Sequence, residues 1–366
     1  MRILVLSKRQ YTGQDLLDDH YGRLYEIPEH LARLGHEVSG LTMSYRKRSE
    51  GRFQDGQVSW QSFNGTPLGR GMLEHLKRVR QEIARFRPDV VWASSDMWHG
   101  IACSRVCSEL KVPFVIDLYD NYESFLLSRI PGTLPLFKRA CRRATGITAI
   151  SEQLSHRLKV SYEIPADRIL NLGNATNGQQ FFRLDKDMAR SALGLPRDSI
   201  LVGTAGALGR GRGTEVILKA HPLLREQLPS LEIVLAGPMD ASLKASSQDG
   251  VHYLGVLPPH EVPNFYNAMD VSLICNRPSA FGTYCYPQKL NEILACNTRL
   301  LAADVGEMSH LLARHPQHLF TAESEKSLAD KILRLLDQAT EPPLPPVFWE
   351  QRAQELSKFL QQRLER

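Results

Sequence analysis

Residues 286–303 read YPQKLNEILACNTRLLAA, a helix-length segment that leads directly into the short apolar run Arg299–Ala303. A helix followed by a buried strand is the unit from which parallel α/β sheets are built. The same alternation runs along the chain twice, which predicts two doubly wound domains. We expect strands at residues 3–6, 37–41, 90–93, 114–117 and 146–149 in the first half, and at 200–204, 232–236, 252–254, 271–274 and 299–303 in the second.

Two segments suggest where the domains divide. The turn-rich sequence NATNG at 174–178 suits a hinge, and the proline run EPPLPP at 341–346 excludes a helix or an inner strand. We therefore predict a first Rossmann-like domain over residues 1–180 and a second over 181–341. Residues 342–366 should form a stiff connector and a last helix that packs on the first domain.

Composition narrows the class of protein. A hydrophobic content of 42% over 366 residues is enough for two ordinary cores, and no apolar run reaches the length of a membrane span. The six cysteines show neither a C-x-x-C pair nor a His/Cys metal spacing. These features favour a protein of the reducing cytoplasm.

Positive charge is concentrated in the first half of the chain. Residues 1–174 carry 25 Lys and Arg against 19 Asp and Glu, whereas the remainder carries 20 against 21. The excess gathers at residues 77–87 and 138–143, interleaved with apolar residues at helical spacing. Such helices can lie on an anionic membrane or bind an acidic partner, but a plain solvated helix face is the ordinary explanation. No nucleic-acid-binding module is recognisable, so nucleic acid is not an expected partner.

The segment at residues 286–303 also has the composition of a nucleotide-binding site. Pro287 is suited to the first turn of a helix, whose N-terminal N–H groups attract phosphate. Lys289 can reach an anion, and Glu292, on the same helix face, offers two acceptor oxygens to a ribose diol. The alternative is an ordinary surface ion pair.

A second loop carries a similar signal. Residues 203–213 read GTAGALGRGRG and follow a predicted strand. The glycines allow close approach of the backbone, Gly206 among them, and Arg210 and Arg212 supply charge for a diphosphate. A flexible turn is the alternative. In a doubly wound sheet this loop and the Lys289 helix would meet at the carboxyl edge, where ligands bind.

The first half carries candidate residues of its own. Gly22 would let the backbone approach a ligand phosphate closely, or simply form a turn. Four polar residues lie at or after predicted strand ends, where we expect their side chains to reach a ligand, and Asp120, Tyr119 and His99 are the candidate catalytic residues. For the sugar transfer implied by the resemblance given below, Asp120 could hold an acceptor hydroxyl or stabilise positive charge on a sugar ring, with loop capping as its ordinary role. These four residues are His99, Asp117, Tyr119 and Asp120.

The D-x-D sequence at residues 185–187 is a potential metal ligand pair. It precedes a predicted helix, where an aspartate is favoured as a cap, and we predict capping. Arginine, lysine and helix dipoles can neutralise a leaving diphosphate, so we expect no metal and no other cofactor.

With these motifs in place, nearly the whole chain resembles the GT-B glycosyltransferases of the family 4 type. The resemblance implies two Rossmann-like domains facing across a cleft, with donor nucleotide in the second, acceptor in the first, and a final helix that crosses back. It also implies retention at the anomeric carbon. The similar segments are YGR at 21–23, LARLGHEV at 31–38, and residues 113–120, 149–152, 174–177, 206–213, 254–271 and 349–350.

Three positions depart from the family pattern. Tyr284 stands eight residues before Glu292, where relatives have a glutamate that holds the donor sugar, and we group Glu292, Tyr284 and Gly282 as ribose and sugar contacts. In the diphosphate loop Ala207 replaces one cation, for which Arg210 could substitute. Tyr119 replaces an acceptor-side histidine.

The expected activity is transfer of a hexose from a nucleoside diphosphate sugar to a hydroxyl of a glycan or lipid-linked acceptor. Gly22, Gly206, Arg210, Arg212 and Lys289 would hold the diphosphate. The enzyme would lie in the cytoplasm or at the cytoplasmic face of the membrane. Two alternatives stay open, a nucleotide-sugar epimerase on the same scaffold and a non-catalytic binding or scaffold subunit.

Overall fold

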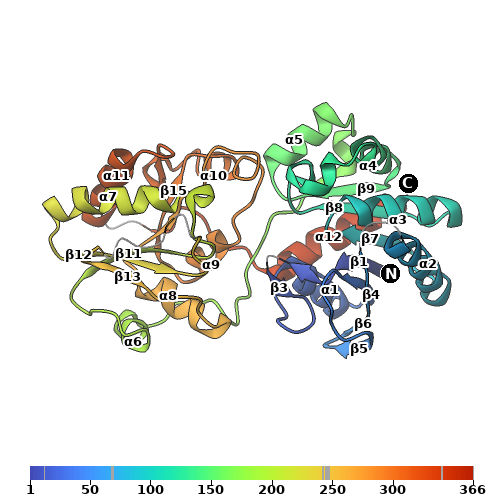
Figure 1. Cartoon of the computed structure of the whole chain (residues 1–366), viewed down its shortest axis with the longest axis horizontal. Coiled ribbons are helices and arrows are strands. Elements are labelled where there is room, and N and C mark those ends of the chain that lie inside the picture. Colours follow the sequence, from blue (N-terminus) through green and yellow to red (C-terminus); the bar gives the residue numbers. More distant parts are fainter. Residues whose placement is uncertain (12, 67–69, 241–242, 244–247, 339–340, 366) are drawn as a thin grey trace. The chain divides into compact units, whose positions relative to one another are not determined.

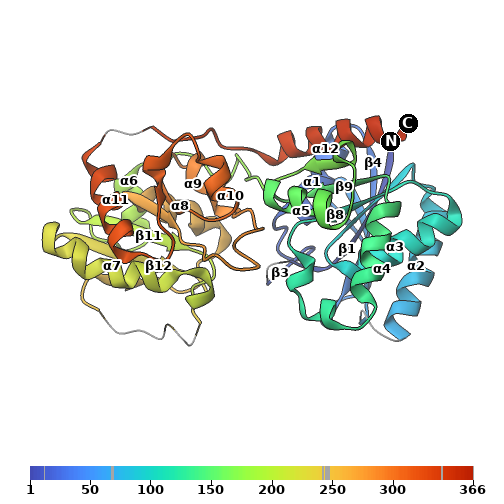
Figure 2. The ribbon, with the colours of Figure 1, turned by 90° about the horizontal axis from the view of Figure 1, so that it is seen from above.

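The computed structural model describes residues 1–11, 13–66, 70–240, 243, 248–338 and 341–365. It divides into two compact units, the first made of Met1–Asn174 with Trp349–Arg366 and the second of Ala175–Phe348. Each unit is a mainly parallel sheet with helices on both faces (Figures 1 and 2). The predicted fold class, two doubly wound Rossmann-like domains, is confirmed.

The division lies at residue 174 rather than at 180, and the proline-rich segment groups with the second unit. The reason is that the two segments that join the units, around Thr176 and around Val347, are hydrogen-bonded to each other. The Thr176 N–H donates to the Val347 carbonyl over 3.0 Å, and Val347 N–H donates to Asn291 Oδ1 over 3.0 Å. Both linkers are thereby anchored within the second unit.

The sheet of the first unit has the order β10-β9-β8-β7-β1-β4-β6-β5, and only β5 runs antiparallel to its neighbour. Its central strands are continuous apolar runs because both faces are buried. The strands are β1 Arg2–Lys8, β4 Glu37–Ser44, β5 Gly51–Asp55, β6 Val58–Asn64, β7 Val90–Ser94, β8 Phe114–Leu118, β9 Gly146–Ala149 and β10 Ile169–Asn171, and a two-stranded hairpin, β2 Gln10–Tyr11 with β3 Gln14–Asp15, follows β1.

Helices α1 and α12 cover one face of this sheet and α2, α3 and α4 the other (Figure 2). The chain proceeds from β1 to β4 in one direction and from β7 to β8 in the other, so the strand order reverses between β1 and β7. The helices are α1 Arg23–Arg33, α2 Arg70–Phe86, α3 Met97–Leu110, α4 Thr133–Arg143, α5 Glu152–Ser161 and α12 Trp349–Leu364.

The sheet of the second unit has the order β13-β12-β11-β14-β15-β16 and is parallel throughout. Here the order reverses between β11 and β14. The strands are β11 Ile200–Ala205, β12 Leu231–Ala236, β13 Val251–Tyr253, β14 Val271–Ile274, β15 Arg299–Ala303 and β16 Leu319–Phe320.

Helices α7 and α11 lie on one side of this sheet, with α6 and α8 on the other (Figure 1). The core between α7, α11 and the sheet is formed by aliphatic residues such as Val202, Ile233 and Ile332, which are fully buried. The helices are α6 Lys186–Ala192, α7 Thr214–Gln227, α8 Val262–Ala268, α9 Lys289–Ala295, α10 Glu307–Leu311 and α11 Glu325–Asp337.

Helix α12 is part of the first unit although it follows the second in the chain. It packs against α1, and Ser357 Oγ lies 2.7 Å from His36 Nε2. Farther along, the Arg363 Nε–H donates to the Thr145 carbonyl over 3.1 Å. Throughout the described ranges, no helix combines the length and the apolarity needed to cross a bilayer.

Candidate functional site

In each unit the candidate site lies where the strand order reverses. At such a point the loops after two neighbouring strands turn to opposite faces of the sheet and leave an opening at its carboxyl edge, which is where open α/β sheets bind ligands. In the second unit these are the loops after β11 and β14, and in the first unit those after β1 and β7.

The structure brings the diphosphate loop and the Lys289 helix together. Lys289 Nζ donates to Thr204 Oγ1, on β11, over 3.1 Å. Gly206 follows this strand with a φ of 110°, and a Cβ atom at this residue would lie 3.5 Å from Lys289 Nζ. Gly213, with a φ of 71°, ends the loop, and a Cβ there would lie only 1.9 Å from the Cys275 carbonyl oxygen. The two loops are therefore in direct contact.

Lys289 is an unusual cation because it is largely enclosed. Burial lowers its pKa to about 8, and the nearby positive charge of Arg212 acts in the same direction, while Cys275 and Glu292 oppose the shift. A lysine with this pKa is still mostly protonated at neutral pH, yet its charge is poorly compensated. An anion bound beside it would supply the missing compensation.

The two predicted loop arginines differ in their surroundings. The Arg212 guanidinium lies over the Phe281 ring, 3.7 Å from its centroid, so it is directed toward the loop after β14. Arg210 is exposed, and its Nε lies 3.3 Å from Glu215 Oε2. The structure therefore groups Arg212 with Lys289, whereas Arg210, in the turn before α7, faces a carboxylate in the first turn of α7.

Glu292 is buried, and its two oxygens have different partners. The Tyr266 hydroxyl donates to Oε2 over 2.9 Å, and the Gln288 amide donates to Oε1 over 3.3 Å. Burial raises its pKa, against the effect of both hydrogen bonds and of Lys289. A carboxylate oxygen accepts more than one hydrogen bond, so each retains capacity for a ligand hydroxyl.

The turn before α9 fixes the remaining predicted donor residues. Gly282 is buried, and a Cβ there would lie 2.0 Å from the Arg277 carbonyl oxygen, so only glycine fits. Tyr284 is partly buried in the turn that follows. The prediction that Pro287 occupies the first helical turn is wrong, because α9 begins at Lys289 and Pro287 only accepts, through its carbonyl, the N–H of Leu290.

In the first unit, Gly22 has the positive φ of 74° that favours glycine and is the N-cap residue immediately before α1. The expectation that Asp117 is directed toward a ligand is wrong. Its side chain is fully buried, and it accepts hydrogen bonds from Arg23 (2.8 Å), Thr148 (2.6 Å) and Ser94 (2.6 Å). This aspartate is a structural ion-pair partner of Arg23.

His99 lies in the first turn of α3 and is completely buried. Its Nδ1 is 2.9 Å from Asp96 Oδ1, while its Nε2 has no hydrogen-bond partner within the described ranges. The neighbouring ring of His75, 4.9 Å away by centroid, has a pKa that burial lowers to about 3 and is therefore neutral. His99 is thus held by Asp96 rather than exposed to solvent.

Tyr119 and Asp120 directly follow β8 and are partly exposed. Burial and neighbouring acidic groups raise the pKa of Tyr119 well above its usual value, so its hydroxyl remains a proton donor. Asp120 Oδ1 accepts the N–H of Asn121 over 2.7 Å. Tyr119 and Asp120 therefore lie at the carboxyl edge of the sheet, where they are partly exposed, whereas His99 is buried.

Sequence reasoning missed the residue that links these loops, Asp96. It caps α3, accepts the hydroxyl of Tyr45 over 2.6 Å, and follows Ser95, whose φ of 122° is strained for a residue with a side chain. Burial alone would raise the pKa of Asp96, but His99, Lys8 and Tyr45 outweigh it and hold the pKa below its usual value. The sequence Ser94-Ser95-Asp96, directly after the predicted strand at 90–93, was the available signal.

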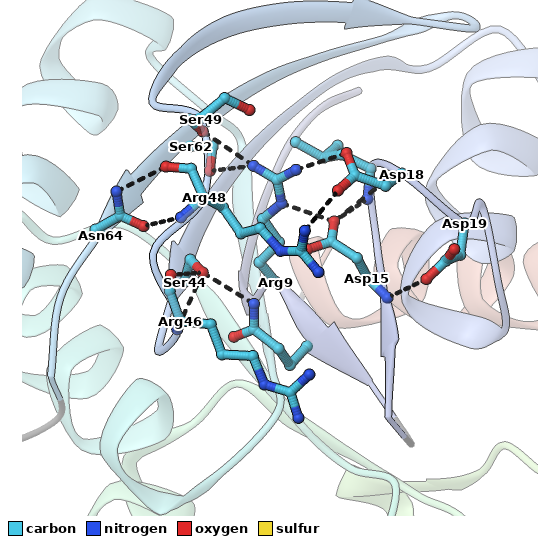
Figure 3. A network of polar contacts seen from close by, with 12 residues as sticks. Arg9, Asp15, Asp18, Asp19, Ser44, Arg46, Arg48, Ser49, Ser62 and Asn64 are labelled. Carbon is cyan, nitrogen blue, oxygen red and sulfur yellow. Dashed lines mark hydrogen bonds and ion pairs between the residues drawn. The ribbon is translucent and has the colours of Figure 1, made fainter.

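Other polar groups at this edge are structural. Arg9 is buried and donates to Asp15 (2.7 Å), Asp18 (2.8 Å) and Ser62 (3.3 Å), a network that anchors the hairpin after β1 (Figure 3). In the second unit, Asp185 caps α6 through Met188 N–H, as predicted. Across the described ranges, no three His, Cys, Asp or Glu side chains are grouped so that they could ligate a metal ion.

Two family models match the chain, Glycosyltransferase Family 4 over residues 23–176 and Glycosyl transferases group 1 over residues 199–338. The putative teichuronic acid biosynthesis glycosyltransferase TuaC of Bacillus subtilis is 26% identical over 279 residues, which cover 76% of this chain and 68% of TuaC. The capsular polysaccharide biosynthesis glycosyltransferase CapM of Staphylococcus aureus is 23% identical over 52% of this chain and 54% of its own length. The D-inositol 3-phosphate glycosyltransferase of Stackebrandtia nassauensis is 26% identical, over 49% of this chain and 43% of its own length.

Solved structures of low sequence identity share the fold. Sucrose-phosphate synthase of Thermosynechococcus elongatus matches with a TM-score of 0.79 and 16% identity over 99% of this chain and 98% of its own. HepE of Anabaena, solved with UDP, matches with a TM-score of 0.72 and 17% identity over 100% and 99%. UDP-GlcNAc 2-epimerase of Methanocaldococcus jannaschii matches with a TM-score of 0.64 and 12% identity, over 99% of this chain and 100% of its own.

The fold and these matches define an enzyme of the GT-B glycosyltransferase class. Within it, the first unit matches the family 4 glycosyltransferases, as the sequence motifs predict, and the second unit matches the group 1 glycosyltransferases; similar proteins include glycosyltransferases of polysaccharide biosynthesis.

Proposed function

We propose that the chain transfers a hexose from a nucleoside diphosphate sugar to a hydroxyl of a glycan or lipid-linked acceptor, with retention of configuration. The observation that carries this proposal is the Lys289 ammonium beside Gly206 at the reversal point of the second sheet. A glycine-lined opening with an incompletely compensated cation suits a diphosphate. HepE, which has the same fold, was solved with UDP and with UDP-glucose, which supports this donor class.

In this proposal the donor is held by the second unit. Lys289 and Arg212 bind the diphosphate, the backbone at Gly206 approaches it closely, and Glu292 accepts hydrogen bonds from the ribose. Arg210 would have to break its ion pair with Glu215 to contact the diphosphate, so we propose that it contributes less to diphosphate binding than Arg212 does. Tyr284 and Gly282 would shape the pocket for the sugar, and Gly22 remains a predicted phosphate contact.

Cleavage of the sugar–phosphate bond leaves negative charge on the diphosphate. The fixed cations Lys289 and Arg212 would stabilise this charge as it develops, which is the largest type of catalytic contribution in such sites. We propose that these residues suffice and that no metal or other cofactor takes part. Addition of EDTA should leave turnover unchanged, and restoration of a lost activity by Mg²⁺ would contradict this part of the proposal.

The acceptor is assigned to the first unit. Asp120 and Tyr119 lie at its carboxyl edge, where Asp120 could accept the proton or hydrogen bond of the acceptor hydroxyl and Tyr119 could donate one. His99, being buried, acts as a positioning residue through Asp96. Retention itself is read from the anomeric configuration of the product by NMR.

We also propose a location at the cytoplasmic face of a membrane. All six cysteines are buried free thiols, which suits a reducing compartment. On α4, Leu136 is half exposed beside basic residues that include Lys138 and Arg139. Much of the basic charge on α2 is already paired, as Arg80 is with Glu109 (2.6 Å). Sedimentation with anionic and with neutral vesicles tests this location, and equal recovery from both would oppose it.

The decisive experiment is turnover of a panel of nucleotide sugars with and without candidate acceptors. Transfer or slow hydrolysis of one donor supports the proposal, and loss of that activity in Glu292→Ala supports the site. Interconversion of the donor sugar without transfer would favour an epimerase, with which the chain shares the fold at 12% identity. Absence of any turnover, with partner binding kept in Glu292→Ala, would favour a scaffold subunit.

A further inference from the structure

The carboxyl edge of the first sheet carries five cations that immediately end β1 or follow β4. Two of them are neutralised: Arg9 donates to Asp15 and Asp18, and Arg48 lies 3.4 Å from Asp15 and 3.7 Å from Asp18 (Figure 3). For the side chains of the other three, no hydrogen bond or ion pair is found with the residues that the structure describes. These three are Lys8, Arg46 and Lys47.

Lys8 is the most enclosed of the three. Its backbone N–H is fixed by Ser95 Oγ over 2.8 Å, at the reversal point between β1 and β7. Its ammonium lies 5.7 Å from the ring centroid of Tyr119 and 5.9 Å from that of Phe125, both partly exposed. Burial lowers the pKa of Lys8, against the fields of Asp96 and Asp120.

The nearby carboxylates do not occupy this ammonium. Asp96 Oδ1 accepts from His99 Nδ1 and two backbone N–H groups, and Oδ2 accepts from Tyr45, so both oxygens are engaged elsewhere. Asp120 Oδ1 accepts from Asn121 N–H. An ammonium has three donors, and those of Lys8 are left for a ligand.

From this geometry we propose that Lys8, flanked by Tyr119 and Phe125 and with Arg46 and Lys47 on the adjoining connection, forms an acceptor subsite for a sugar ring that carries an anionic substituent, a carboxylate or a phosphate. Aromatic rings provide apolar surface for the face of a sugar, and Lys8 provides the charge-assisted hydrogen bonds. The inference rests on the proposed function in that it takes the bound sugar to be the acceptor. It extends that function by specifying that the acceptor sugar carries a negative charge.

The test is calorimetric titration of the full chain with methyl β-glucuronide, glucose 6-phosphate and the neutral methyl β-glucoside. A charge-assisted hydrogen bond of this kind corresponds to a preference of about 10- to 100-fold for one of the anionic sugars. Lys8→Met, which keeps the length of the side chain, should abolish the preference, and Lys8→Arg should restore most of it. Whichever anion is preferred identifies the substituent.

Two control variants separate this subsite from other basic sites. Lys77→Met removes an exposed charge of the same unit, and Lys289→Met removes the donor-site cation, and the preference should survive both. Equal affinity for all three sugars, no binding of either anion, or a preference that survives Lys8→Met but not Lys289→Met would overturn the proposal. The proposed glycosyl transfer is judged separately, by donor turnover, and can hold or fail independently of this preference.

Discussion

Replacement of Lys289 by methionine should have opposite effects on ligand affinity and on stability. The side chain donates to Thr204 and is otherwise surrounded by groups that leave its charge poorly compensated. In the absence of ligand this charge is a cost to the folded state. With a diphosphate bound, it becomes a source of affinity.

The stability effect follows from the pKa, which burial lowers from 10.5 to about 8. Between these two values the unfolded chain holds a proton that the folded chain lacks, so the wild type should gain stability as the pH rises through this window. At pH 7 both states are protonated and the folded state bears the whole penalty, about 3 kcal/mol for a drop of about 2.5 pKa units. Lys289→Met removes the penalty and loses one hydrogen bond, so we expect a net gain of about 1–3 kcal/mol at pH 7.

The affinity effect has the other sign. Loss of charge-assisted hydrogen bonds worth about 1.5–3 kcal/mol weakens binding about 10- to 100-fold. Titration with UDP and with inorganic pyrophosphate measures it, and for the wild type the affinity should fall as the pH rises above about 8, where Lys289 loses its proton. Lys219→Met, an exposed change on α7, is the matched control. A Lys289→Met protein that binds pyrophosphate as tightly as the wild type, or that is less stable at pH 7, would refute the reasoning.

Three further predictions concern single contacts. Arg212→Met should weaken pyrophosphate binding about tenfold in calorimetry. Arg210→Met removes an exposed partner of a carboxylate and should change the affinity less than about threefold. The reverse order of the two effects would contradict the assignment of Arg212 to the diphosphate site. Asp117→Ala should destabilise the first unit by about 3–5 kcal/mol in urea unfolding because it leaves the buried Arg23 guanidinium uncompensated, and a loss below 1 kcal/mol would show that the pair is replaceable. Gly282→Ala places a Cβ 2.0 Å from a backbone oxygen, so it should distort the turn before α9 and lower donor affinity with little change in acceptor binding, and an unchanged donor Kd would show that the turn adapts.

The strands that the sequence predicts are those buried on both faces. The apolar runs 271–274 and 299–303 are β14 and β15 at the predicted bounds, because a fully buried parallel strand has little room for polar residues. Strands β5 and β6 were missed, since Ser, Gln and Asp alternate through them at the sheet edge. Strand β10 has only three residues, too few for a periodic signal.

The candidate site was predictable in one unit and only partly in the other. Gly206 and Lys289 each follow a recognisable strand, so the topology alone predicts that their loops meet. Asp117 was misread because its partner, Arg23, lies 94 positions earlier in the chain. Asp96 escaped notice for a similar reason, since its role appears only when Tyr45 and Lys8 are brought beside it by other strands.

Because α12 completes the first unit, the chain order of synthesis and the order of assembly differ. Leu356 and Leu360 are fully buried in that unit, yet they leave the ribosome after every residue of the second unit has been made. The first unit therefore cannot complete its packing, and the surface of α1 that contacts α12 stays uncovered, while the second unit already has all the sequence that it needs to fold. Truncation at the carboxyl terminus would accordingly damage the half of the enzyme that is translated first.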